Sequence, residues 1–215
     1  MSQDSARLEK SLQLIALTQR VQALAQTALA YEVSPFERKR CEELLEISAA
    51  LFAIQSTSSP ETILAKLREE TGYATPKVGV RVAIAQGHSI LFVREATDNK
   101  WCLPGGWVDV GLSPSQAATV EVSEETGLSV KSLSLRAIYD SSKHLHDPVC
   151  PFQVFTLFFS AEVAGGSLTP SSETTELRYF TKSELPELST QRVTKSQVLR
   201  MWDYIDDPQL PVYVD

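Results

Sequence analysis

Three carboxylates fall within five residues, at Glu121, Glu124 and Glu125, shortly after the glycine pair Gly105-Gly106. On a helix, Glu121 and Glu125 stand one turn apart, with about 5–6 Å between their Cβ atoms. Like charges at this spacing repel each other, and the C-terminal end of a helix disfavours anions. A hard divalent cation such as Mg²⁺ would offset both penalties, because it binds carboxylate oxygens. The cluster is therefore either a cation site or a solvated acidic helix end.

The chain contains a similar stretch, "LREETG" from Leu67 to Gly72, in which Arg68 can pair with the acidic charge. No glycine pair precedes it at a suitable distance. We interpret that stretch as a solvated helix end, since acidic triplets of this kind are common on protein surfaces. The glutamates alone therefore do not distinguish the segment that follows Gly105 from this stretch. The preceding glycine pair does.

A helix over residues 114–126 must position the carboxylates. Ser113 and Gln116 have the spacing of a capping box, and Pro114 suits the first helical position. Gly127 supplies a left-handed stop at the other end. No lysine or arginine lies within this helix to neutralise the glutamates.

The flanking segments alternate apolar and polar residues, as strands do. Val78, Val80, Val82 and Ile84 begin a hairpin that turns at "QGHS". Further strands are expected at 133–140, 152–163 and 176–180, and a last helix near "SQVLRMWDYI". Strands, a central helix, strands and a late helix predict an α+β domain with a mixed sheet. Phe152, Phe155, Phe158, Phe159 and Trp202 are expected in its core.

Residues 5–55 predict two helices with apolar stripes, followed by a short helix that begins at Ser59-Pro60. The first stripe contains Leu14, Leu17, Val21, Leu24 and Ala28, and the second contains Leu44, Ile47, Leu51 and Ile54. Two such helices bury little by themselves, so they should pack on the rest of the chain or on a second copy. A homodimer through this arm is one hypothesis.

The composition excludes several classes of protein. The 215 residues carry a net charge of −7, which disfavours a broad basic surface for nucleic acid. Cys41, Cys102 and Cys150 show neither a disulfide framework nor zinc spacing. No apolar signal segment or membrane span is visible, so we expect a cytoplasmic protein.

Residues 106–128 resemble the Nudix box of the Nudix hydrolase family. The matching positions are Gly106, Glu121, Val122, Glu124, Glu125, Gly127 and Leu128. Leu112 and Val120 stand where the box has its first glutamate and its arginine. The helical arm, "YATPKVGVR", "GLSPS" and "KHLHDP" are similar to the Nudix subgroup typified by CDP-choline pyrophosphatase, which is often labelled ADP-ribose pyrophosphatase.

This resemblance implies a Nudix α/β/α sandwich at residues 76–212, preceded by a helical domain at 1–72 that serves as a dimerisation or substrate-lid arm. Glu121, Glu125 and the carbonyl of Gly105 would bind Mg²⁺ or Mn²⁺, and Glu124 would act through water or a second ion. The implied reaction is hydrolysis of a nucleoside diphosphate linked to another moiety, such as CDP-choline or ADP-ribose, into two monophosphates.

The remaining roles are open between alternatives. Glu173 is our candidate general base, with Glu176 as its competitor and a solvated loop as the third possibility. Arg81 could reach a diphosphate or be a surface charge on a strand, and Trp107 could stack on a base or pack the loop. The subgroup resemblance implies that Lys143 and His144 contact the substrate. A zinc site at His144 and His146 lacks further ligands.

Two functions from different classes remain. The first is a Mg²⁺-dependent pyrophosphohydrolase, with RNA ends as a secondary substrate. The second is a catalytically silent Nudix fold that senses a nucleotide or mediates an interaction. The replacements at Leu112 and Val120 favour the second, and the three glutamates of the box favour the first.

Overall fold

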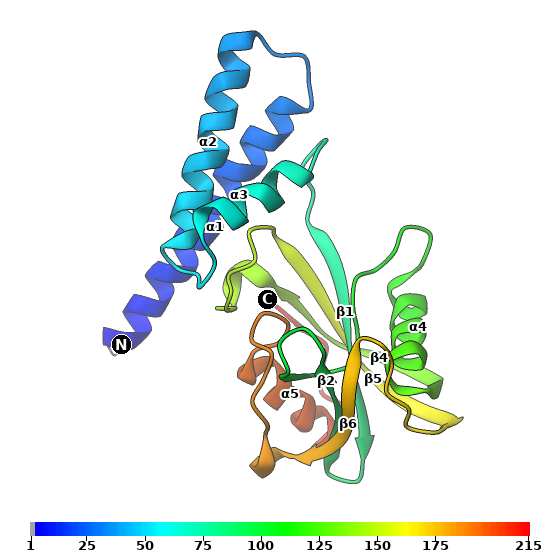
Figure 1. The fold of residues 1–215 in the computed structure, drawn as a ribbon. Helices are drawn as coiled ribbons and strands as arrows, with labels where there is room; N and C mark the ends of the chain where they lie inside the picture. The colour runs from blue at the N-terminus through cyan, green and yellow to red at the C-terminus, as the bar shows by residue number, and fades with distance from the viewer. Residues whose placement is uncertain (1–2) are drawn as a thin grey trace. The chain divides into compact units, whose positions relative to one another are not determined.

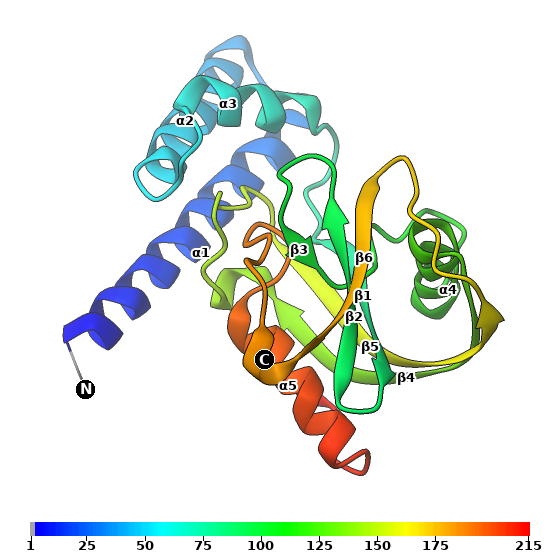
Figure 2. The ribbon, with the colours of Figure 1, turned by 60° about the horizontal axis from the view of Figure 1, so that its bottom comes forward.

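The computed structural model describes residues 3–215, which divide into two compact units. The helical unit contains residues up to 77 together with 141–154, and the sheet unit contains 78–140 and 155–215. Both are drawn in Figures 1 and 2. Within the described range, no helix combines the length and the apolar character needed to cross a membrane.

The helical unit contains α1 (Gln3–Leu29), α2 (Pro35–Ala53), α3 (Pro60–Glu69) and the 3₁₀ turn η1 (Ser141–Lys143). The predicted helix starts at Ser34 and Ser59 are confirmed, since each side chain accepts a backbone N–H of the first turn. Its core is small and contains Ile15, Ala49, Phe52, Ile63, Leu67 and Val149. Residues 141–154 contribute Val149 to this core, which explains why they belong to the helical unit.

The predicted apolar stripes of α1 and α2 are only partly covered within the unit, and Leu14, Val21 and Ala28 of the first are half-buried. Leu17 and Leu24 are 58% and 52% exposed, and Ile47 and Ile54 of α2 are 47% and 73% exposed. Within the helical unit these four side chains are therefore not covered, and the alternative of packing on a second copy stays a prediction. The buried face of α1 is instead largely polar and contains Ile15, Thr18, Gln19, Gln22, Ala25 and Gln26.

Within the described residues, the sheet unit builds a seven-stranded sheet. Its strands are β1 (Lys77–Gln86), β2 (Ser89–Glu95), β3 (Trp101–Cys102), β4 (Leu128–Asp140), β5 (Val154–Gly166), β6 (Thr174–Thr181) and β7 (Tyr213–Val214). Their order is β3-β2-β1-β5-β4-β7, and β6 also pairs with β2. Because β7 runs parallel to β4 while β4 and β5 are antiparallel, the predicted mixed sheet is confirmed.

The helices α4 (Pro114–Thr126) and α5 (Lys195–Asp206) lie on opposite faces of this sheet, as both views show (Figures 1 and 2). A short 3₁₀ turn, η2 (Lys182–Glu184), follows β6. One core joins Val80 and Leu91 to Val122 of α4, and the other joins Phe92 and Phe158 to Trp202 of α5. Alternate residues of β1 and β5 face opposite cores, and the predicted α+β sandwich is confirmed. Phe159 is also buried, whereas Phe152 and Phe155 are half-buried.

Candidate active site

The helix α4 holds the carboxylate cluster in one place. Ser113 and Gln116 form the predicted capping box, and Gly127 ends the helix in the left-handed region at φ 72°. Ala117, Ala118 and Val122 are buried and fix the face that α4 turns to the sheet. The glutamates therefore lie in the last turns of a firmly seated helix.

The glycine pair before α4 allows two close approaches that a side chain would block. Gly105 has φ 138°, and a Cβ there would lie 2.2 Å from the backbone oxygen of Val80. A Cβ on Gly106 would lie 2.4 Å from Oε1 of Glu121. The backbone N–H of Val80 in turn donates to the carbonyl of Gly106 at 2.9 Å. The loop thus lies against both β1 and the carboxylates of α4.

The carboxylate of Glu125 is almost completely buried, with the residue 6% exposed. Its Oε2 accepts the backbone N–H of Gly105 at 2.8 Å. Burial raises the pKa of Glu125 from 4.5 to about 7, with a smaller contribution from the charge of Glu121. Burial also raises the pKa of the half-buried Glu121. Both carboxylates are thus held where their ionised forms are disfavoured.

The cation that opposes this effect is Arg81 of β1. Its guanidinium donates to the carbonyl oxygens of Gly105 and Leu103. Its charge lowers the pKa of both Glu121 and Glu125, although less than burial raises it. Sequence reasoning considered Arg81 as a diphosphate contact but missed this role, because a strand residue cannot be placed beside a helix from spacing alone.

Other acids lie within electrostatic range of Glu121. The charges of Glu124, Glu173 and Asp109 each raise its pKa further. Asp109 was not predicted, and its only sequence signal was its place in the loop between the glycine pair and α4. The structure therefore brings Glu121, Glu124, Glu125 and Glu173 into one acidic region, as the sequence suggested.

The two candidate bases differ in their surroundings. Glu173 is exposed, and its carboxylate has no hydrogen bond or ion pair with any of residues 3–215. Glu176 forms an ion pair with Arg94 at 3.3 Å, and these two residues are also partners in the β2–β6 register. The side chain of Glu173 is the one left available.

A buried polar network adjoins the site and was not predicted. The thiol of Cys102 donates to Oε1 of Glu95 at 2.8 Å, and Nε of Arg192 lies 3.1 Å from the same oxygen. Burial keeps the pKa of the Cys102 thiol well above its usual range, so the sulfur remains protonated. Arg192 compensates the charge of Glu95 and thus stabilises the strands beside the glycine loop.

The remaining predicted residues lie in different places. Trp107 is 55% exposed beside the glycine pair. Lys143 and His144 belong to the helical unit, where Lys143 is exposed and His146 is 9% exposed. Leu112 and Val120, the two departures from the Nudix box, are exposed by 36% and 39%. Neither replacement disturbs the buried part of the carboxylate cluster.

The donor set suits a hard divalent cation in its chemistry. Among the described residues, no three His, Cys, Asp or Glu side chains converge on a common point. The set at the glycine pair instead contains the carboxylates of Glu121 and Glu125 and the carbonyl oxygen of Gly105. These oxygen donors, whose negative charge Arg81 offsets only in part, match the preference of Mg²⁺, which keeps several waters in its coordination shell.

Comparison with known proteins decides the family. Residues 75–201 match the family model of the NUDIX domain. The chain belongs to the Nudix family. Residues 12–67 of this Nudix hydrolase match a second family model, the UDP-X-like N-terminal oligomerisation domain. The predicted combination of a Nudix domain with a helical N-terminal domain is therefore confirmed.

Individual relatives of the Nudix hydrolase support the same assignment. YjhB of Bacillus subtilis (strain 168), whose name assigns it provisionally to the ADP-ribose pyrophosphatases, is 36% identical over 197 residues, covering 92% of this chain and 94% of YjhB. A crystal structure of UDP-X diphosphatase is 28% identical with a TM-score of 0.61, covering 95% of this chain and 99% of that one. An ADP-ribose pyrophosphatase from Streptococcus suis 89-1591 is 34% identical with a TM-score of 0.59, covering 66% and 100%.

Alanine substitutions at the two glycines of the pair should affect different properties, stability at Gly105 and hydrolysis at Gly106. Gly105→Ala should destabilise the Nudix hydrolase by about 2–4 kcal/mol, because backbone at β1 cannot yield to the new Cβ. Gly106→Ala should leave stability nearly unchanged, because the Glu121 carboxylate can swing away, but this displacement should slow hydrolysis about 10²-fold.

Urea unfolding and a hydrolysis assay measure both effects. Gly165→Ala is the matched control, since a Cβ there meets open space. Equal destabilisation by all three substitutions would contradict the close approaches described for the glycine pair.

Proposed function

We propose that the protein is a Mg²⁺-dependent pyrophosphohydrolase that cleaves a nucleoside diphosphate linked to another moiety into two monophosphates. Mn²⁺ would substitute for Mg²⁺, and compounds of the CDP-choline or ADP-ribose type are the leading substrates. The observation that carries the proposal is the pair of carboxylates, Glu121 and Glu125, held against the glycine loop with raised pKa values. The names of the ADP-ribose pyrophosphatase and UDP-X diphosphatase relatives favour this substrate class.

In this proposal, Glu121, Glu125 and the carbonyl of Gly105 hold the metal, and Glu124 acts through water or a second ion. When bound, the metal would polarise the phosphoryl oxygens and lower the pKa of the attacking water. The guanidinium of Arg81 donates to the carbonyl of Gly105, whose oxygen keeps a second lone pair for a metal. A guanidinium in this place would also be able to bind a diphosphate oxygen.

Glu173 is proposed as the general base that accepts the proton of the attacking water. Its free carboxylate and its influence on the pKa of Glu121 support this role. Trp107, Lys143 and His144 are proposed as substrate contacts, with stacking by the exposed Trp107 ring. In the assay described next, Glu173→Gln should slow hydrolysis, whereas Glu176→Gln should change it little because Glu176 is already paired with Arg94.

A screen of nucleoside diphosphate derivatives and short 5′-triphosphorylated RNA, with Mg²⁺ and with Mn²⁺, tests the proposal. The expected result is metal-dependent release of a nucleoside monophosphate from CDP-choline, ADP-ribose or a related compound. RNA ends should react more slowly, because a protein of net charge −7 attracts polyanions poorly. Nucleotide binding without release from any compound would favour the silent sensing module instead.

We further propose that residues 1–72 form a dimerisation arm and that the protein is a homodimer. The exposed apolar side chains of α1 and α2 support this, since Leu17, Leu24, Ile47 and Ile54 would otherwise remain in water. The description of the matching family model as an oligomerisation domain points the same way. A second copy of the stripe is the occupant with matching apolar character.

Leu17→Glu combined with Leu24→Glu should convert the proposed dimer into a monomer, because four like charges would then face each other across the two-fold axis. Light scattering coupled to size-exclusion chromatography measures the mass directly against the 23.8 kDa of one chain. Leu168→Glu, in an exposed loop position of the sheet unit, is the control and should leave the mass unchanged. A monomeric wild-type protein would contradict the proposal.

A further inference from the structure

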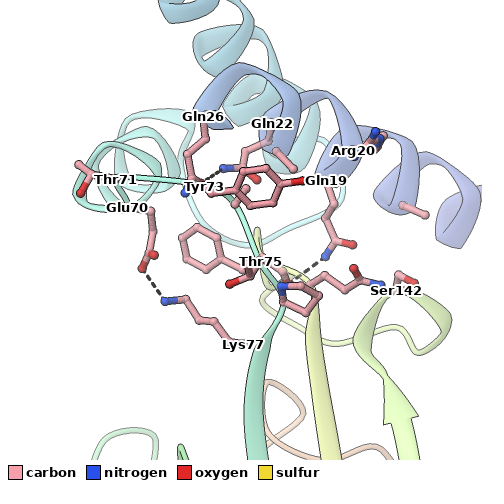
Figure 3. A pocket seen from close by; sticks show the side chains of 16 residues that line it. Gln19, Arg20, Gln22, Gln26, Glu70, Thr71, Tyr73, Thr75, Lys77 and Ser142 are labelled. Atoms are coloured by element: carbon pink, nitrogen blue, oxygen red, sulfur yellow. Dashed lines mark hydrogen bonds and ion pairs between the residues drawn. The ribbon is translucent and has the colours of Figure 1, made fainter. Parts of the chain in front are cut away.

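The helical unit contains a pocket of about 490 Å³ that takes no part in the Nudix box (Figure 3). One wall is the inner face of α1, and the other is the extended segment from Glu70 to Lys77. Ser142, Phe152 and Gln153 close it from the segment 141–154. All of its lining residues lie within the helical unit, so the pocket is complete in that unit alone.

The inner wall of this pocket contains three glutamines. Gln19, Gln22 and Gln26 share one face of α1, and the residues are only 7%, 3% and 7% exposed. A helix that turns glutamines inward and leucines outward is unusual, since buried amides lose their hydrogen bonds to water. Their partners therefore decide what the wall can bind.

Hydrogen bonds to backbone carbonyls fix the orientation of the glutamine side-chain amides. The Nε2 of Gln19 donates to the carbonyl oxygens of Cys150 and Phe152, at 3.2 and 3.0 Å. The Nε2 of Gln26 donates to the carbonyl of Gly72 at 3.2 Å, which leaves its Oε1 to accept from Nε2 of Gln22 at 2.7 Å. Because a carbonyl only accepts, neither Gln19 nor Gln26 can be flipped without losing these bonds.

This orientation leaves two acceptors without a donor. Oε1 of Gln19 and Oε1 of Gln22 accept no hydrogen bond from residues 3–215, and neither oxygen is sealed off from solvent. Gln22 and Gln26 each retain one unused N–H. The wall therefore presents two acceptors and two donors, a pattern that matches a ligand with both N–H groups and acceptor atoms.

The rim supplies an aromatic surface and positive charge. Tyr73 is 66% exposed, and its ring lies across the mouth in front of Gln22 and Gln26 (Figure 3). Lys77 forms an ion pair with Glu70 at 2.6 Å, which cancels both charges. Arg20 has no ion pair or hydrogen bond in the described part of the chain, so the lining has a net charge of +1.

We propose that this pocket binds a nucleoside monophosphate whose base carries an exocyclic amino group, as cytosine and adenine do. The amino group donates to the oxygens of Gln19 and Gln22, and the adjacent ring nitrogen accepts the free N–H of Gln22. Tyr73 stacks on the base, and Arg20 is the counter-charge for the phosphate. The site does not depend on turnover at the Nudix box, so its failure and that of the proposed function are separate results.

Isothermal titration of the full-length protein in EDTA tests this site, because the chelator removes metal-dependent binding at the box. The ligands form two matched pairs, CMP with UMP and AMP with IMP, in which an amino group is replaced by an oxygen. We expect the aminated member of each pair to bind about tenfold more tightly or better. Equal binding within both pairs, or no binding by any of the four, would overturn the proposal.

Variants locate the binding. Gln22→Met should weaken CMP and AMP about tenfold while leaving UMP and IMP unchanged, since it removes the amide and keeps the length of the side chain. Gln13→Met, the same substitution at an exposed position of α1, is the matched control. Tyr73→Ala, at an exposed position that folding does not require, should weaken all four ligands. Wild-type affinity in both Gln22→Met and Tyr73→Ala would show that the nucleotides bind elsewhere.

Discussion

Glu125→Gln is expected to lower the hydrolysis rate by about 10³-fold or more. The substitution converts one of the two carboxylates that would hold the metal into a neutral amide. A metal contributes several kcal/mol of charge stabilisation in a transition state. The fold should survive, because the amide oxygen of glutamine can still accept the N–H of Gly105. Steady-state kinetics with the substrate found in the screen, together with a circular dichroism spectrum, measure both parts of the prediction.

The chain supplies a matched control for this variant. Glu69 belongs to the "LREETG" stretch, lies at the exposed C-terminal end of α3 and is the last residue of that helix. Glu69→Gln should therefore hydrolyse substrate at the wild-type rate. Hydrolysis by Glu125→Gln within tenfold of the wild type would rule out the proposed metal site.

The same variant is expected to be more stable than the wild type at alkaline pH. Glu125 has a pKa of about 7 in the folded protein against 4.5 ordinarily. Between these two values the folded state binds the extra proton, so stability falls as pH rises through the window. The ionised carboxylate thus costs about 3 kcal/mol above pH 7, at about 1.4 kcal/mol for each tenfold change in the proton equilibrium. Glutamine carries no such penalty.

Urea unfolding in EDTA at pH 5, 7 and 8.5 measures this difference. The gap between Glu125→Gln and the wild type should be small at pH 5 and reach about 3 kcal/mol at pH 8.5. Addition of Mg²⁺ should then stabilise the wild type and not the variant, because an ion that binds only the folded state shifts the equilibrium toward it. A wild type that is more stable than the variant at pH 8.5 in EDTA would show that burial does not disfavour the ionised form of Glu125.

Local sequence signals predicted the elements of the site well. The capping box at Ser113 and the stop at Gly127 both lie within a few residues of the helix that they delimit, so α4 has its predicted bounds. The strands followed from alternation over short windows, and β4, β5 and β6 contain the segments expected at 133–140, 152–163 and 176–180 apart from the first two residues of 152–163.

Contacts between distant segments could not be predicted in this way. Periodicity identified the apolar side of α1, but it cannot tell whether the same chain or another covers that side. It also did not predict that Gln19, Gln22 and Gln26 are buried. Arg81 compensates carboxylates that are 40 and 44 residues further along the chain. Even in the control stretch, Arg68 pairs with Glu42 and Glu46 of α2, and Glu70 with Lys77, rather than with neighbours in sequence.

If the exposed leucines of α1 hold the proposed dimer together, the fraction of dimer depends on the protein concentration in each experiment. In the proposed dimer, dilution into the nanomolar range of an enzyme assay would release protomers whose Leu17 and Leu24 are again in water. Melting temperatures recorded at micromolar concentration would then describe a different species from the one that turns over substrate. Adsorption of the released protomers to plastic and detergent-dependent specific activity are the practical signs of that transition.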